Sequence, residues 1–149
     1  MYKNILVAID LMEGPAHQVL SGALAFGEET AQYTVVHVVE PQYVQYSFDP
    51  TFTGSLTREL EQQAIENATD RMSELCASME MTPQEQQIVL GRAADQIHEL
   101  AKHRDADLIV IGSHGRHGWR RLLGSTANAV LHGAPVDVAV IRIPENQDT

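Results

Sequence analysis

A glycine-rich, basic segment between residues 112 and 124 contains the residue types that bind phosphate. After Gly112 come three more glycines and three arginines, in a chain that is otherwise acidic. Glycine has no Cβ, so its backbone can approach an anion closely. Arginine adds positive charge and several N–H donors. The pattern predicts an anion site, although a solvated basic patch beside a helix would have the same composition.

Two predicted elements would position this segment. The apolar run 107–111 is typical of a buried strand, and Ser125 to His132 is typical of a short helix that ends at Gly133. The first N–H groups of a helix, here those of Ser125 and Thr126, lack partners within it and can bind an anion.

Asp10 is a second candidate for chemistry. It directly follows the apolar run Ile5 to Ile9, which is typical of a strand buried on both faces. A carboxylate at the end of such a strand can accept hydrogen bonds from the two hydroxyls of a ribose. The same residue would also serve as a helix N-cap or as a simple surface charge.

Strand and helix patterns alternate along the whole chain. Further strands are predicted at 33–39, 85–90 and 136–143, and further helices from Pro15, over about 56–79 and over 93–103. This alternation predicts one α/β domain over 1–149, with a doubly wound, five-stranded, mostly parallel sheet in the order 3-2-1-4-5 and helices on both faces. Ligands of such sheets bind beyond the carboxyl ends of the strands, where Asp10, residues 37–38 and Gly112 would meet.

The composition limits the class of protein. The chain has 149 residues, a formal net charge of -10 and 44% hydrophobic residues, which fits a soluble globular domain. The acidity argues against binding nucleic acid or docking on an anionic membrane. Cys76 is the only cysteine, and neither a signal-peptide pattern nor an apolar run of about 18 residues is present, which predicts a cytoplasmic protein.

The pattern Gly112-x-x-Gly115-x8-Gly124-Ser125 resembles the nucleotide-binding signature of the universal stress proteins. ATP-binding members of that family have nine residues in the second spacer, where this chain has eight. The resemblance implies the fold of adenine nucleotide α-hydrolase-like proteins. It also implies a dimeric regulatory or sensor protein of the cytoplasmic stress response, which binds ATP, with Mg²⁺ on its phosphates, rather than turning it over.

The resemblance also implies a role for each residue of the site. Asp10 would bind the ribose, Val38 would read the adenine edge through its backbone, and the first two glycines would let the chain pass close to ribose and phosphates. The full set of expected nucleotide contacts is Ala8, Ile9, Asp10, Val38, Gly112, Gly115, Arg116, Gly124, Ser125 and Thr126. Arg120 and Arg121 are alternatives to Arg116 as the charged contact.

Other chemistry has less support. His114 and His117 lie close together, but a zinc site needs three or four ligands and no third is near, so no metal ligands are assigned. The patterns Gly-x-Ser-x-Gly and Gly-Lys-Ser/Thr are absent, so no catalytic residues are assigned. Two alternatives stay open: a nucleotide-free interaction module of the stress response, and a slow ATPase or phosphotransfer enzyme.

The last predicted strand, Val136 to Ile143, is long, apolar and at a sheet edge in this order. An exposed edge invites pairing, and pairing with its twin about a two-fold axis would cover it. We therefore expect a homodimer through this strand, unless Asp137 and Arg142 protect the edge by their charge. The loop 41–54, with four of the seven Tyr and Phe residues, would be either an interaction surface or a plug on the core.

Overall fold

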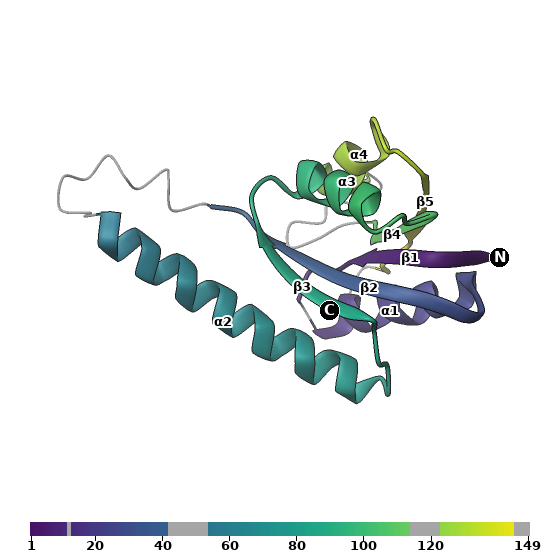
Figure 1. Cartoon of the computed structure of the whole chain (residues 1–149), viewed down its shortest axis with the longest axis horizontal. Helices are drawn as coiled ribbons and strands as arrows, with labels where there is room; N and C mark the ends of the chain where they lie inside the picture. Colours follow the sequence, from purple (N-terminus) through teal and green to yellow (C-terminus); the bar gives the residue numbers. More distant parts are fainter. Residues whose placement is uncertain (12, 42–53, 114–122, 145–149) are drawn as a thin grey trace.

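The computed structural model describes residues 1–11, 13–41, 54–113 and 123–144. Strands and helices alternate from the first residues to the last (Figure 1). The elements are β1 Tyr2–Ala8, α1 Glu13–Phe26, β2 Gly27–Val39, α2 Gly54–Ser78, β3 Glu85–Leu90, α3 Ala93–His103, β4 Leu108–Gly112, α4 Ser125–Leu131 and β5 Asp137–Ile141. The predicted loop 41–54 falls almost entirely outside the described residues.

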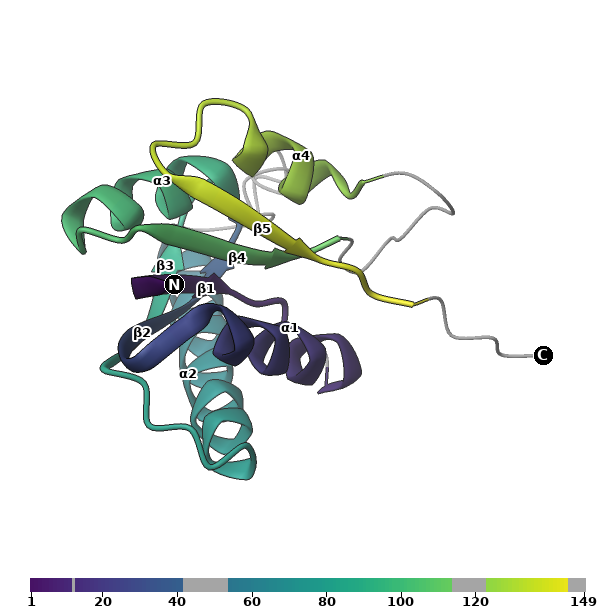
Figure 2. The same cartoon turned by 90° about the vertical axis from the view of Figure 1, so that its right-hand side faces the viewer.

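The five strands form one parallel sheet in the order β3-β2-β1-β4-β5, which confirms the predicted order. The first strand of the chain therefore lies at the centre of the sheet. The last strand lies at one edge (Figure 2). All carboxyl ends point the same way, so the segments that leave the strands gather along one side.

The alternation of side chains along the central strands builds two cores. Ile5 and Val7 of β1 face α1 and α2, whereas Leu6 and Ala8 face α3 and α4. Figure 1 shows the two pairs of helices on opposite faces of the sheet. Both faces of β1 are buried, which explains its nearly unbroken apolar sequence.

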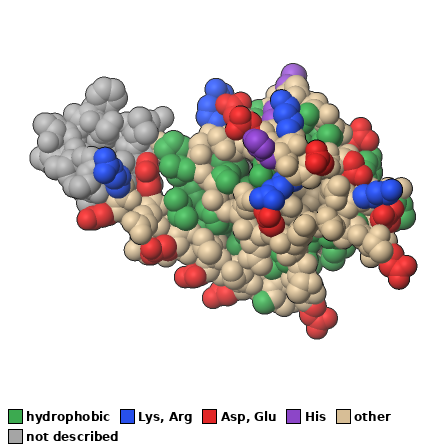
Figure 3. Space-filling view, in the orientation of Figure 1, with side chains coloured by type: hydrophobic (Ala, Val, Ile, Leu, Met, Phe, Trp, Pro, Cys, Tyr) green, Lys and Arg blue, Asp and Glu red, His purple; other side chains and the backbone are tan. Residues whose placement is uncertain are grey.

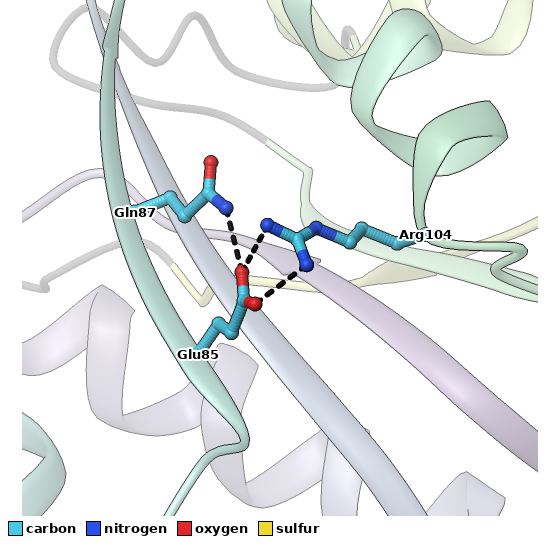
Figure 4. Close-up of polar contacts among 3 residues, drawn as sticks. All are labelled: Glu85, Gln87 and Arg104. Atoms are coloured by element: carbon cyan, nitrogen blue, oxygen red, sulfur yellow. Dashed lines mark hydrogen bonds and ion pairs between the residues drawn. The ribbon is translucent and has the colours of Figure 1, made fainter.

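Polar contacts hold the amino ends of the strands. The Asp107 carboxylate accepts hydrogen bonds from the backbone N–H groups of Lys3 and Asn4, both at 2.9 Å. At the end of α3, Arg104 forms a two-pronged ion pair with Glu85 of β3, which also accepts a hydrogen bond from Gln87 at 2.7 Å (Figure 4). These contacts fix α3 on the sheet at the side opposite the carboxyl ends.

The second strand begins earlier than its sequence predicts. It starts at Gly27 rather than Tyr33, because Gly27 pairs with Tyr2 beyond a register shift in β1. The intervening residues 28–32 are polar except for Ala31 and are partly or fully exposed, so they lack the apolar pattern of a buried strand. The last strand, Asp137–Ile141, is shorter than the predicted range Val136 to Ile143.

The surface reflects the acidic composition. Figure 3 shows acidic side chains spaced along α2, where Glu59, Glu66, Asp70 and Glu74 are exposed. Among the described residues, no helix is both long enough and apolar enough to cross a membrane.

Candidate functional site

A cavity of about 570 Å³ lies at the carboxyl ends of β1, β2 and β4. It is lined by the ends of these strands, by the starts of α1, α3 and α4, and by the middle of α2. Its size falls within the usual range for small-molecule sites. A cavity here is the arrangement that a doubly wound sheet provides where neighbouring crossovers leave in opposite directions.

The structure gathers eight of the ten predicted site residues on the wall of this one cavity. They come from four separate segments of the chain and are Ala8, Ile9, Asp10, Val38, Gly112, Gly124, Ser125 and Thr126. The other two, Gly115 and Arg116, lie outside the described residues, as do Arg120 and Arg121. Their contribution stays a prediction.

The ladder between β1 and β2 ends at the cavity. Ile9 N–H donates to the Val36 carbonyl at 2.9 Å, and the Ile9 carbonyl accepts a hydrogen bond from His37 Nδ1 at 2.8 Å. On the other side of β2, the Val39 carbonyl accepts from the N–H of Gly91 at 3.1 Å. In a strand, the N–H and C=O of one residue point to one neighbouring strand, and those of the next residue point to the other. Those of Val36 face β1 and those of Val39 face β3, so the N–H and C=O of Val38 again point to the β1 side. The Val38 peptide group is therefore directed past the end of β1.

The end of β4 is closely packed. A Cβ on Gly112 would lie 3.1 Å from Val19 Cγ2, so glycine lets α1 approach the strand. Beyond it, Ser113 N–H donates to the Ile141 carbonyl at 2.8 Å and Ser113 Oγ accepts from Ile143 N–H at 2.9 Å. The N–H of Gly124 donates to the Ser113 carbonyl, which brings the two ends of the glycine-rich segment together.

Sequence reasoning missed the contribution of α2, and it placed His37 at this edge of the sheet without assigning it a role. Asn67 and Arg71 line the cavity from α2, and Arg71 is the one Lys or Arg side chain among the described lining residues. Asp10 and Glu40 are the acidic residues of that lining. No local motif marks Asn67 or Arg71, because α2 reaches the cavity only through its packing.

A Ser–His contact elsewhere lacks the geometry of an activated nucleophile. Ser78 Oγ lies 3.1 Å from His17 Nε2 and donates its proton to the Leu75 carbonyl at 2.7 Å. Because that proton is engaged, the histidine nitrogen must act as the donor to Ser78 rather than as its base. Within the described residues there is also no cluster of three or more potential metal ligands.

Comparison with known proteins agrees with this architecture. The sequence model of the universal stress protein family matches residues 1–142. Universal stress protein A homolog 1 of Coxiella burnetii is 36% identical over 144 residues, which cover 97% of this chain and 99% of the relative. The chain belongs to the universal stress protein family.

Solved structures share the fold. Universal stress protein UspA from Lactobacillus plantarum superimposes with a TM-score of 0.74 at 29% identity, over 95% of this chain and 98% of that one. The universal stress protein from Archaeoglobus fulgidus in complex with dAMP superimposes with a TM-score of 0.56 at 22% identity, over 94% and 98% of the two chains. At 22% identity, the likeness to the Archaeoglobus fulgidus protein shows a shared fold alone.

Proposed function

We propose that this protein binds an adenine nucleotide, ATP with Mg²⁺, in the cavity at the carboxyl ends of the strands. In this proposal it is a regulatory or sensor protein of the cytoplasmic stress response, and it binds the nucleotide without turning it over. The observation that carries the proposal is the convergence of eight predicted nucleotide contacts on one cavity of about 570 Å³.

The chemistry of the wall is suited to each part of the ligand. The exposed Asp10 carboxylate can accept hydrogen bonds from the ribose hydroxyls, and Ala8 and Ile9 offer apolar surface to the base. The peptide group of Val38 carries a donor and an acceptor, as the edge of adenine requires.

The phosphates would lie against Gly112, Gly124, Ser125 and Thr126. The backbone N–H groups of Ser125 and Thr126 and their two hydroxyls are donors suited to phosphate oxygens. Magnesium on those oxygens needs few ligands from the protein, because it keeps several waters and binds phosphate directly. The Archaeoglobus fulgidus protein in complex with dAMP supports the proposal, since it shows that this fold can hold an adenine nucleotide.

The melting temperature of nucleotide-stripped protein, with and without Mg-ATP, tests the proposal. A ligand at about 100 times its Kd adds roughly 2.7 kcal/mol to the stability of the folded state. For a domain of this size that is a rise of about 5–10 °C. No rise at millimolar ATP would contradict the proposal and favour the nucleotide-free interaction module. Release of inorganic phosphate, lost in Asp10→Ala, would favour the slow ATPase.

Gly124→Val tests whether the cavity is the site. Gly124 has φ -56° and ψ 152°, which any residue can adopt, so valine adds bulk to the wall without backbone strain. The thermal response to Mg-ATP should be lost in this variant. Ala129→Val is a suitable control, because Ala129 is exposed on the same helix and does not line the cavity.

We also propose a homodimer through the last strand. The Ile141 carbonyl faces β4, where it accepts from Ser113 N–H. Because the direction of the backbone N–H and C=O groups alternates along a strand, the N–H and C=O groups of Val138 and Val140 face the open edge of the sheet. An unpaired edge is a template for another strand, and a two-fold axis would satisfy both copies at once.

A further inference from the structure

His37 lies on the wall of the cavity with one ring nitrogen already engaged. It precedes Val38 near the end of β2 and is half-buried. Its Nδ1 is 2.8 Å from the carbonyl oxygen of Ile9. A carbonyl oxygen only accepts hydrogen bonds, so Nδ1 must carry the proton. In the neutral ring, Nε2 is then an acceptor with a free lone pair.

The second nitrogen of His37 has no partner among the described residues. We propose that His37 is a specificity-determining residue, whose Nε2 accepts a hydrogen bond from the 6-amino group of a bound adenine. This inference rests on the proposed function, because it assigns one atom of the same cavity to one atom of the nucleotide.

The other groups of the wall favour the amino group over the ribose as the partner of His37. Asp10 already offers two carboxylate oxygens for the two ribose hydroxyls. The 6-amino group carries two N–H donors, and the Val38 carbonyl would accept only one of them. His37 is the neighbour of Val38 and is tied to Ile9, so it can supply the second acceptor at the base.

Two substitutions separate the two nitrogens of the ring. In His37→Asn the side-chain amide can still donate to the Ile9 carbonyl, because its nitrogen is as far along the chain as Nδ1, but the acceptor at Nε2 is gone. In His37→Gln the amide oxygen reaches one bond further and can replace Nε2, while the bond to Ile9 is lost.

The affinities of ATP and of purine riboside triphosphate, which lacks the 6-amino group, are measured by calorimetry for each variant. We expect the unchanged protein to prefer ATP about tenfold. His37→Asn should bring the preference down to about twofold by weakening ATP binding alone, and His37→Gln should keep most of it. The ratio of two affinities in one variant is insensitive to a general loss of stability.

His98→Gln is the matched control, because the glutamine amide nitrogen reaches as far along the side chain as Nε2 and can keep the bond that His98 makes. His98 is also half-buried and donates a ring N–H to a backbone carbonyl, that of Val130 at 2.7 Å, but it does not line the cavity. It should leave the preference for ATP unchanged. The inference is overturned if His37→Asn keeps the tenfold preference, or if it weakens both ligands equally. If the unchanged protein binds both ligands with equal affinity, this inference alone fails; if it binds neither, the proposed function fails as well.

Discussion

Replacing Gly112 with alanine should destabilise the protein, because the added methyl group has no room. It would lie 3.1 Å from Val19 Cγ2 and 3.4 Å from Ile143 Cγ1. Val19 is 4% exposed and Ile143 6%, so neither neighbour can turn away into solvent. Such overpacking costs about 1–3 kcal/mol. Alanine recovers about 0.5–1 kcal/mol by restricting the unfolded chain, which leaves a net loss of about 1 kcal/mol.

Urea unfolding followed by circular dichroism measures this change. With a slope of about 1–3 kcal/mol per molar urea, the midpoint should fall by roughly 0.3–1 M. Gly14→Ala is the control in which the added methyl group meets no packed neighbour. Gly14 lies in the first turn of α1, directly before Pro15, with nothing within 4 Å of an added Cβ apart from its chain neighbours. The gain in helix propensity is opposed by the restriction that Pro15 places on the preceding residue, so this variant should be near neutral.

A double-mutant cycle then identifies the cause. Val19→Ala removes the atom that the new methyl group would approach most closely, and by itself it destabilises the core. Combined with Gly112→Ala, it should cost about 1 kcal/mol less than the sum of the two single changes. Strict additivity, or a Gly112→Ala variant that is as stable as Gly14→Ala, would refute the close approach of α1 to β4.

Three further predictions concern other parts of the molecule. Val138→Pro should convert the proposed dimer to a monomer in analytical ultracentrifugation without unfolding it, because it removes an outward N–H and leaves the β4 ladder intact; a persisting dimer would place the interface elsewhere. Burial raises the pKa of the Cys76 thiol. The folded protein should therefore react with thiol reagents far more slowly than the unfolded chain, and fast labelling at pH 8 would argue against a buried thiol. Because the unfolded chain loses the thiol proton at a lower pH than the folded protein, the free energy of unfolding should decrease as the pH rises above the ordinary thiol pKa of 9.0. Arg104→Gln should lower the free energy of unfolding by about 0.5–1 kcal/mol, because its ion pair is two-pronged and partly shielded, whereas Arg92→Gln, in a more exposed pair at 3.9 Å, should be near neutral in the same denaturation assay.

The order of the sheet and most of its elements could be predicted from the sequence. Burial on both faces leaves a strong apolar signal in β1 and β4, and the alternation of strands with helices predicts the other elements. The range 85–90 for β3 and 93–103 for α3 match the structure. The first part of β2 could not be predicted in this way. Four of its residues 28–32 are polar, and the segment joins the strand through pairing near Tyr2 rather than through its own pattern.

The candidate site was predictable only where local motifs exist. Asp10 at a strand end and Gly124 before a helix have signals within a few residues of themselves. Arg71 has none, since it reaches the cavity through the packing of a helix that begins 46 residues after the end of β1. The free nitrogen of His37 was equally hidden, because it depends on a contact with Ile9, 28 residues away in the chain.

The central position of β1 has a consequence for synthesis of the chain on the ribosome. Its pairing with β2 can form once residue 39 has emerged, but its other neighbour, β4, begins about 70 residues later. At roughly 5–20 residues per second, one edge of β1, with its unpaired backbone N–H and C=O groups, stays uncovered for about 4–14 s. Truncated chains that end before residue 108 should therefore bind chaperones through this edge, and the nascent chain acquires a complete cavity only after α4 has emerged.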